Sequence, residues 1–169
     1  MPGPLDDVRV LDLTQGLAGP YRTMLLGNAG ADVVKVEPLD GDDARRYAPA
    51  LASGDGTQFI ELDRDKQGIV VDVERPEGLE VVRRLLREVD VLVTDFGPAR
   101  AAALGLDYPG VEAVNRRVVH CNITPFGERG PMADQPGAEV VVQAMAEYPA
   151  SVGALGKAPQ RLGTRRFRR

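Results

Sequence analysis

Short apolar runs rich in β-branched residues alternate along the chain with segments in which apolar residues recur every three or four positions. The first pattern is typical of buried strands, and the second is typical of helices with one buried face. Strands are predicted at residues 8–13, 32–38, 59–62, 68–72, 90–94 and 118–123. Helices are predicted at residues 18–30, 76–88, 107–114 and 138–148, the last of them apolar enough to be buried. A strand, a helix and a strand follow one another within the first 38 residues, which predicts a βαβ unit, a parallel sheet and an α/β fold.

Helix-breaking and capping residues set the ends of several of these segments. Pro20 occupies an early position of the first helix, where a proline is tolerated, and Gly30 closes that helix. Pro38 ends the second strand, and Asp107 is the expected N-cap of the third helix. Residues 40–56 are polar and rich in turn-forming residues, so they are predicted to form a surface excursion.

Composition and charge exclude several classes of function. A chain of 169 residues is about one domain long, and its net charge of -4 gives no reason to expect nucleic acid or an acidic membrane as a partner. No apolar run approaches the roughly 20 residues that span a bilayer, and the first residues show no secretory signal. The single cysteine, Cys121, cannot form an internal disulfide, which fits a reducing cytosol, and the single histidine, His120, excludes a metal site of several histidines. We therefore expect a cytoplasmic protein with no metal, nucleic-acid or membrane partner.

Residues 121–153 hold the candidate chemistry. They run from the end of a strand, through a loop rich in proline and glycine, into the apolar helix at residues 138–148. Glu139 stands at the start of that helix, directly before three valines. A carboxylate in this position suits the helix dipole, a contribution of about 0.3–1 kcal/mol. Alternatively, the carboxylate faces a cleft at the loop-to-helix corner, where α/β proteins place their reactive groups.

The order of residues in this stretch resembles the class III CoA-transferases, the family of the formyl-CoA and carnitine CoA-transferases. That family carries a catalytic aspartate in a loop of the form ITGFGxxGPxxxRPGYDxxxQAM. The matching segments here are ITPFG at 123–127, GP at 130–131, QPGAE at 135–139 and QAM at 143–145. The resemblance runs from about residue 8 to residue 156 and includes DLTxxLAGP at 12–20 and KVEP at 35–38. Glu139 takes the place of the family's catalytic aspartate.

The resemblance implies that CoA is transferred through a carboxylate-bound intermediate. Glu139 would attack an acyl-CoA thioester, and CoA would then be held on this side chain as a thioester until a free carboxylic acid takes it. Backbone N–H groups of Phe126, Gly127 and Gly130 would stabilise the oxyanions. Glutamate has one more methylene than aspartate, which moves the carboxyl by more than ~1 Å, and a displacement of that size can cost about 100-fold in rate.

Four further residues are implied to contact CoA. Ala18, in the loop after the first strand, would offer backbone contact, and Lys66 would pair with a CoA phosphate. Asp95 and Phe96 stand where the family has an Asn-Phe pair that clamps the adenine end of CoA. The phenylalanine is retained and would stack on the adenine, whereas Asp95 replaces the asparagine. From the residues alone, Ala18 equally marks the start of a helix packed on its own sheet. Phe96 is equally typical of a core aromatic at a strand end.

The resemblance also implies an incomplete fold. Residues 1–156 would form a partial Rossmann-like parallel sheet with flanking helices, the N-terminal part of the family's large domain. The Arg-rich residues 157–169 would be a disordered tail, with the chain truncated relative to its family. Family chains are roughly twice as long or more and form interlocked dimers, so we expect an exposed apolar face and either a homodimer or a complementary subunit.

Two functions are predicted on this basis. The first is a CoA-transferase-like protein that moves CoA between an acyl-CoA and a carboxylic acid, weak or inactive as this short chain. CoA or acyl-CoA is then a substrate, and no covalently bound cofactor is involved. The second is a non-catalytic acyl-CoA-binding or partner subunit.

Overall fold

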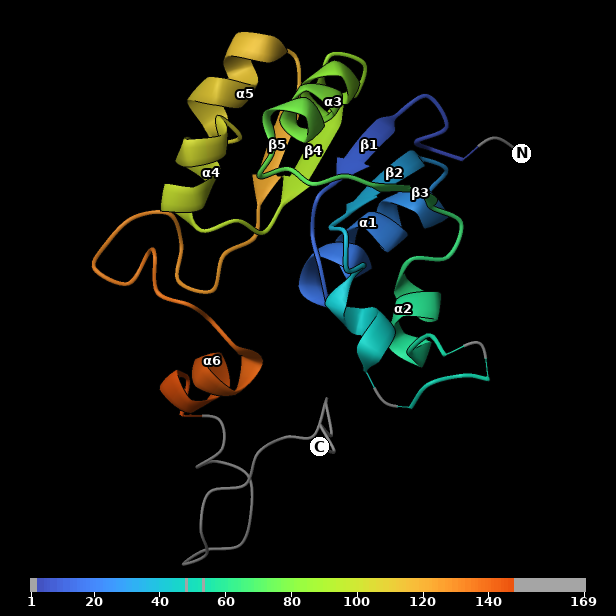
Figure 1. The fold of residues 1–169 in the computed structure, drawn as a ribbon, viewed down its shortest axis with the longest axis vertical. Helices are drawn as coiled ribbons and strands as arrows, with labels where there is room; N and C mark the ends of the chain where they lie inside the picture. The colour runs from blue at the N-terminus through green and yellow to red at the C-terminus, as the bar shows by residue number, and fades with distance from the viewer. Residues whose placement is uncertain (1–2, 48, 53, 148–169) are drawn as a thin grey trace, which may run out of the picture.

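Five strands and their connecting helices make up residues 3–47, 49–52 and 54–147, the part of the chain described by the computed structural model (Figure 1). The strands are β1 (Arg9–Asp12), β2 (Asp32–Glu37), β3 (Gln67–Val70), β4 (Val91–Thr94) and β5 (Val119–Asn122). The α-helices are α1 (Ala18–Asn28), α2 (Thr57–Leu62), α3 (Pro76–Leu86), α4 (Pro98–Leu104), α5 (Tyr108–Val114) and α6 (Glu139–Met145). A short 3-10 helix, η1 (Asp43–Arg46), lies between β2 and α2. Within these residues, no helix has the length and apolar character needed to cross a membrane.

The strands form one parallel sheet in the order β3-β2-β1-β4-β5. Val10 of β1 pairs with Val33 of β2 on one side and with Val91 of β4 on the other. The chain therefore builds outward from β1 in one direction and then returns across β1 to add β4 and β5. This reversal opens a crevice at the carboxyl ends of β1 and β4, which is where doubly wound sheets bind ligands. The predicted Rossmann-like α/β fold is confirmed.

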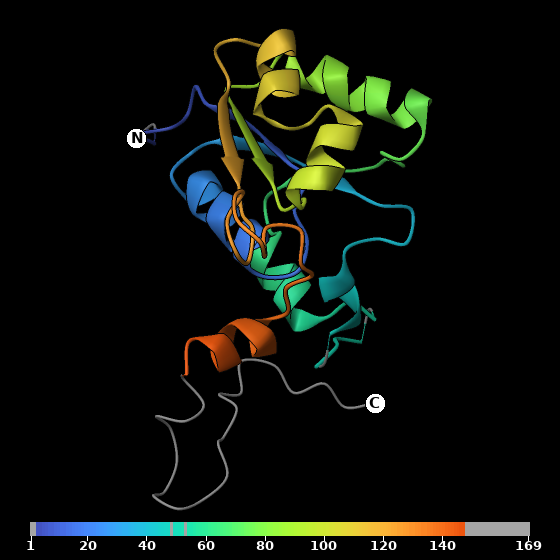
Figure 2. The ribbon, with the colours of Figure 1, turned by 90° about the vertical axis from the view of Figure 1, so that its left-hand side faces the viewer.

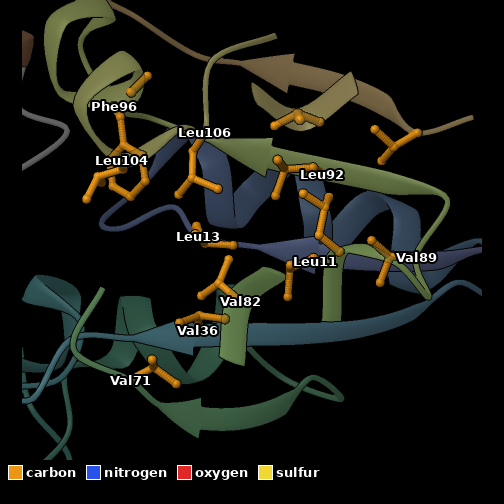
Figure 3. Packing of buried hydrophobic residues seen from close by; sticks show 14 residues of the cluster. Leu11, Leu13, Val36, Val71, Val82, Val89, Leu92, Phe96, Leu104 and Leu106 are labelled. Atoms are coloured by element: carbon orange, nitrogen blue, oxygen red, sulfur yellow. The ribbon is translucent and has the colours of Figure 1, made fainter. Parts of the chain in front are cut away.

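Alternate strand residues point to two differently covered faces of the sheet. Leu11 and Leu92 belong to the main core, which α3, α4 and α5 cover and which Figure 3 shows from close by. Val10 and Val33 point to the opposite face, where Leu26 of α1 packs against them. Figures 1 and 2 both place α3, α4 and α5 on one side of the sheet and α1 on the other. Each fully buried leucine or valine of this kind contributes about 1.5–3 kcal/mol, so the sheet is held mainly by its two covered faces.

The segment predicted as a strand at residues 59–62 is instead part of the helix α2, and that prediction is wrong. Gly56 is the N-cap of this helix, and its carbonyl accepts the N–H of Ile60. β3 pairs with β2 in parallel, so the chain has to cross back over the sheet between these two strands. Two strands joined by the short turn at residues 63–67 would have paired antiparallel. The loop after β2, together with α2, supplies the crossover.

The ends of α4 and α5 follow local sequence signals. Pro98 lies in the first turn of α4, and Gly105 ends that helix with a φ of 64°, in the left-handed region that glycine adopts without strain. No helix was predicted here. Asp107 accepts the N–H of Gly110 at 3.2 Å, which confirms its predicted role as the N-cap of α5.

α6 lies apart from the sheet, at the end of the long loop that follows β5 (Figures 1 and 2). Its apolar side chains are 39–54% exposed: Val140, Val141, Val142 and Met145. The helix predicted at residues 138–148 is confirmed as far as Met145, but its predicted burial is wrong. The loop carries α6 away from both core clusters of the described residues, and the expected exposed apolar face is therefore found on this helix. The predicted domain end at residue 156 and the predicted tail at 157–169 lie outside the described residues.

Candidate functional site

An open cavity of about 1020 Å³ lies at the carboxyl ends of β1, β4 and β5. Gln15, from the loop after β1, and Ala18, at the start of α1, line one wall. Asp95 and Gly97 follow β4, and the remaining wall comes mainly from residues between 123 and 143. The volume falls at the upper end of the roughly 300–1,000 Å³ usual for small-molecule sites. The cavity thus occupies the crevice created by the reversal of strand order.

The loop after β5 forms the far wall of the cavity, and two contacts fix its conformation. A Cβ added at Gly137 would lie 2.0 Å from Cγ of Pro125, so this close approach requires glycine. Asp134 Oδ1 accepts the N–H of Ala99 at 2.8 Å, which ties the loop to the first turn of α4. The loop therefore has a defined path from β5 to α6.

Glu139 begins α6 at this wall. Its neighbours in the chain, Ala138 and Val140, both line the cavity, and Ala138 is the extended N-cap of the helix, with φ -123° and ψ 151°. The backbone of Glu139 therefore enters a helix at the edge of the cavity. This position fits both interpretations left open above, an acid that suits the helix dipole and an acid at a ligand cavity.

The loop after β1 is fixed by side chains from three other segments. Lys35 Nζ, from β2, donates to the carbonyl of Thr14 at 2.8 Å, and Asp42 Oδ1 accepts the N–H of Gly16 at 3.0 Å. Gln58 Nε2, from α2, donates to the carbonyl of Gly16 at 3.0 Å. Because these backbone groups are held by buried or half-buried side chains, the loop presents a defined backbone to the cavity.

Two of these anchors belong to a buried cluster of three carboxylates and two ammonium groups. Its side chains are 0–3% exposed: Asp12, Lys35, Asp42, Asp63 and Lys66. Lys35 Nζ lies 2.8 Å from Asp42 Oδ2 and 3.3 Å from Asp63 Oδ1. Burial lowers the pKa of Lys35, but the carboxylates of Asp12, Asp63 and Asp42 outweigh this effect and raise the pKa above its ordinary value. Burial likewise raises the pKa of Asp12, but Lys35, Lys66 and hydrogen bonds lower it below its ordinary value. Lys35 and Asp12 are therefore both charged at neutral pH.

Asp95 joins the two sides of the crevice. Its Oδ2 accepts the N–H of Gln15 at 2.8 Å, which links the end of β4 to the loop after β1. Burial raises the pKa of Asp95 to about 6, partly opposed by this hydrogen bond. The site therefore contains a carboxyl group that titrates close to physiological pH.

The family model of CoA-transferase family III matches residues 5–166 of the chain. The chain belongs to this family. The match includes the motif at residues 121–153 and the loop at 12–20, and so it covers every wall of the cavity.

Curated relatives of this family III chain include several named CoA-transferases. It is 38% identical over 143 residues to the succinyl-CoA:glutarate CoA-transferase of Mus musculus, which covers 84% of this chain and 33% of that protein. It is also 38% identical over 167 residues to the succinate–glutarate CoA-transferase of Agrobacterium fabrum, which covers 95% of this chain and 42% of that protein. A succinyl-CoA–L-malate CoA-transferase beta subunit of Chloroflexus aurantiacus is 36% identical over 135 residues, covering 79% of this chain and 33% of that protein.

Solved structures show the same fold. A CaiB/BaiF family protein from Brucella suis superposes with a TM-score of 0.89 at 36% identity, covering 97% of this chain and 44% of that one. Rv3272 from Mycobacterium tuberculosis superposes with a TM-score of 0.85 at 31% identity, covering 96% of this chain and 44% of that one. The family III chain therefore spans less than half the length of these relatives and structures.

Among the residues that the family resemblance implies for CoA contact, Ala18 and Asp95 line the cavity. Lys66 does not. Its Nζ lies 2.7 Å from Asp63 Oδ1, 2.7 Å from Thr23 Oγ1 and 3.1 Å from Asp12 Oδ2, and its side chain is 3% exposed. An ammonium group has three donors, and here they are directed at buried acceptors of the protein. We therefore assign Lys66 to the support of α1 and β1, and not to a ligand phosphate.

Phe96 is 5% exposed and packs in the main core, as Figure 3 shows. The guanidinium carbon of Arg100 lies 4.4 Å from the centre of its ring. Phe96 also borders a second, smaller cavity of about 70 Å³ that shares Gln15 with the large one. Its ring thus has the core position typical of a strand-end aromatic, at the border of a space adjoining the site.

The three residues implied as oxyanion donors, Phe126, Gly127 and Gly130, are not among the residues that line the cavity. Gly127 and Gly130 are exposed, with φ of 82° and 104°, and a Cβ added to either would have only its chain neighbours within 4 Å. Phe126 is half-buried beside them. The structure does not bring these three residues together with Ala18 and Asp95.

Gln15 was not predicted as a site residue, although it lines both cavities and its N–H is bonded to Asp95. Its place directly after the first strand was the available signal, because ligands of parallel sheets bind at the carboxyl ends of strands. Among the described residues, no group of three His, Cys, Asp or Glu side chains could hold a metal ion.

Proposed function

We propose that the chain is the CoA-binding portion of a CoA-transferase that moves CoA from an acyl-CoA to a carboxylic acid, with Glu139 as the carboxylate nucleophile. The observation that supports this proposal is the cavity at the strand-order reversal, because Ala138 and Val140, the chain neighbours of Glu139 at the start of α6, line it. Family membership supports CoA transfer as the reaction, and the relatives named for succinyl-CoA support a succinyl thioester as donor.

The proposed reaction proceeds through four exchanges at carboxyl carbons. The Glu139 carboxylate attacks the thioester carbonyl, which forms a mixed anhydride and releases CoA thiolate. The thiolate attacks the glutamyl carbonyl of that anhydride, which frees the donor acid and leaves CoA bound to Glu139 as a thioester. The acceptor carboxylate then displaces CoA thiolate to form a second anhydride. Attack of the thiolate on the acceptor carbonyl gives the new acyl-CoA and restores the glutamate. A carboxylate suits this sequence because it serves as both nucleophile and leaving group.

The walls of the cavity are proposed to position CoA for these four reaction steps. The loop after β1 places the backbone of Ala18 and Gly19 at the cavity, and its shape is fixed by the buried ion cluster. Phe96 and the small cavity beside Gln15 are proposed to receive the adenine end of CoA. Phe126, Gly127 and Gly130 are proposed as oxyanion donors, which requires their loop to move toward the cavity from its present exposed position. The extra methylene of Glu139 predicts slower transfer than an aspartate would give.

A second function is favoured by the exposure of α6. This helix leaves four apolar side chains exposed, and two of them, Val140 and Val142, line the cavity. In this alternative the chain is an acyl-CoA-binding partner whose exposed helix packs against a second copy or a complementary subunit, and Glu139 does not react.

Peptide mass spectrometry after incubation with succinyl-CoA separates the two functions. Trypsin releases residues 130–157, which contain both Glu139 and Glu147. Transfer through Glu139 predicts a CoA thioester on this peptide in the wild-type protein and in Glu147→Gln, and its absence in Glu139→Gln. CoA binding without any modification of Glu139 supports the partner subunit. A folded protein that binds no CoA contradicts both.

A further inference from the structure

Asp95 brings a negative charge into a cavity that, in the proposed function, receives a highly anionic ligand. Asp95 lines the cavity, and its carboxyl is fixed by the N–H of Gln15 at 2.8 Å. A carboxylate in this place repels phosphate and diphosphate groups, whereas its hydrogen bond to Gln15 stabilises the loop that lines the opposite wall. The charge of Asp95 therefore weakens the binding of an anionic ligand, whereas its hydrogen bond supports binding by holding the loop in place.

We propose that Asp95 is a proton-dependent selectivity residue of the cavity: its hydrogen bond holds the loop after β1, while its charge weakens the binding of anionic ligands until a proton neutralises it. This inference rests on the proposed function for its ligand, CoA. It adds that CoA binding is coupled to proton uptake by this protein.

The surroundings of Asp95 explain why its charge is poorly compensated. Asp12 on β1 and Asp42 before η1 both oppose its ionisation, and Lys35 on β2 favours it. Lys35 is already paired with Asp42 at 2.8 Å and with Asp63 at 3.3 Å, so the nearest ammonium is shared among several carboxylates. Burial is the largest effect and brings the pKa of Asp95 to about 6. A bound anion would raise it further, because a like charge nearby disfavours ionisation.

The coupling has a definite sign. Below pH 6 the neutral carboxyl does not oppose the ligand, so affinity is highest there. Affinity falls as pH rises through about 6 and levels off above the pKa of the bound state. Removing one charge beside a solvent-open cavity should change affinity by about three- to tenfold.

Calorimetric titration with dephospho-CoA tests the proposal, because this ligand lacks the phosphate monoester that itself titrates near pH 6. Asp95→Asn keeps an oxygen that can accept the Gln15 N–H and removes the charge, so it should bind about three- to tenfold more tightly at pH 7.5 and equally at pH 5. Asp95→Ala loses the acceptor and should bind more weakly than Asp95→Asn at both pH values.

Proton uptake by the wild-type protein gives a readout that needs no variant. Titrations at pH 6.5 in two buffers of different ionisation enthalpy should show net uptake, which Asp95→Asn abolishes. Wild-type binding without proton uptake, or with uptake that Asp95→Asn retains, would overturn the role of Asp95 while leaving CoA binding intact. The absence of dephospho-CoA and CoA binding in wild type and both variants would instead overturn the proposed function.

Discussion

Replacing Lys66 by methionine tests whether this side chain supports the fold or contacts the ligand. Its ammonium lies within 3.1 Å of Asp12 Oδ2, Asp63 Oδ1 and Thr23 Oγ1, and the side chain is 3% exposed. Methionine keeps the length and the apolar stem but removes the charge. The three buried carboxylates of the cluster would then share Lys35 as its one remaining ammonium group.

The expected loss follows from the burial of that cluster. Breaking a buried ion pair by removing one partner costs about 3–5 kcal/mol, because an uncompensated charge is left behind. Domains of this size have a free energy of unfolding of about 5–15 kcal/mol, so Lys66→Met should lose a large part of its stability. With a urea dependence of about 2 kcal/mol per molar, the unfolding midpoint should fall by about 1.5–2.5 M.

Urea unfolding followed by circular dichroism measures this shift. Arg84→Met is the matched control, since Arg84 pairs with Glu80 at 3.4 Å on the surface with its side chain 74% exposed. Its unfolding free energy should change by less than about 0.5 kcal/mol. A Lys66→Met protein with wild-type stability but weakened CoA binding would refute the assignment of Lys66 to the fold and restore the phosphate contact.

Two further predictions concern the cavity walls. In α1, a Cβ at Gly19 would lie 2.1 Å from Cβ of Thr14, whereas one at Gly27 would lie 3.6 Å from the nearest side chain, Val33. Gly19→Ala should therefore lower the unfolding free energy by about 1–3 kcal/mol and weaken CoA binding. Gly27→Ala, the control, should be neutral or should raise the unfolding free energy by up to about 1 kcal/mol. Equal effects of the two substitutions would contradict this packing. Asp95→Asn should raise the unfolding free energy at pH 7.5 by about 1–2 kcal/mol, since an acid whose folded pKa of about 6 exceeds its unfolded value destabilises the fold once ionised. The gain should shrink as pH falls through 6 and vanish near pH 4, and a gain that is constant between pH 4 and pH 7.5 in thermal unfolding would show that charge is not its cause.

The fold could be predicted in large part from local pattern. The β-branched runs at β1, β2, β4 and β5 are separated by helices or glycine and proline signals, and together they require a parallel sheet. The strand prediction at residues 59–62 was wrong because a short apolar segment is compatible with either a strand or a helix. The parallel pairing of β3 with β2 shows that this segment belongs to the crossover between the two strands. The burial predicted for α6 failed because apolar character shows that a helix has a face to cover but not that the described chain supplies the cover.

The buried charges were the least predictable part of the site. Asp12 and Lys35 lie at the same alternation as Val10 and Val33, which places them on the α1 face of the sheet. A charged residue in an apolar strand is unusual, so the two positions could be singled out from the sequence. Their partners could not, because Asp63 and Lys66 lie far from them along the chain. Resemblance alone placed Lys66 on a phosphate because a motif records that a residue is present, and not which way its side chain points.

Binding of CoA at the carboxyl edge of β1, β4 and β5 is tested most directly by amide chemical shifts in the nitrogen-15 labelled protein. Titration with CoA should shift the resonances of Ala18, Gly19, Asp95, Gly97 and Thr124, which line the cavity on three separate segments. The amides of α5, on the far side of the main core, should stay unchanged. Saturable shifts on all three segments are the result that the proposed function predicts, and shifts absent from them in a folded protein would contradict it.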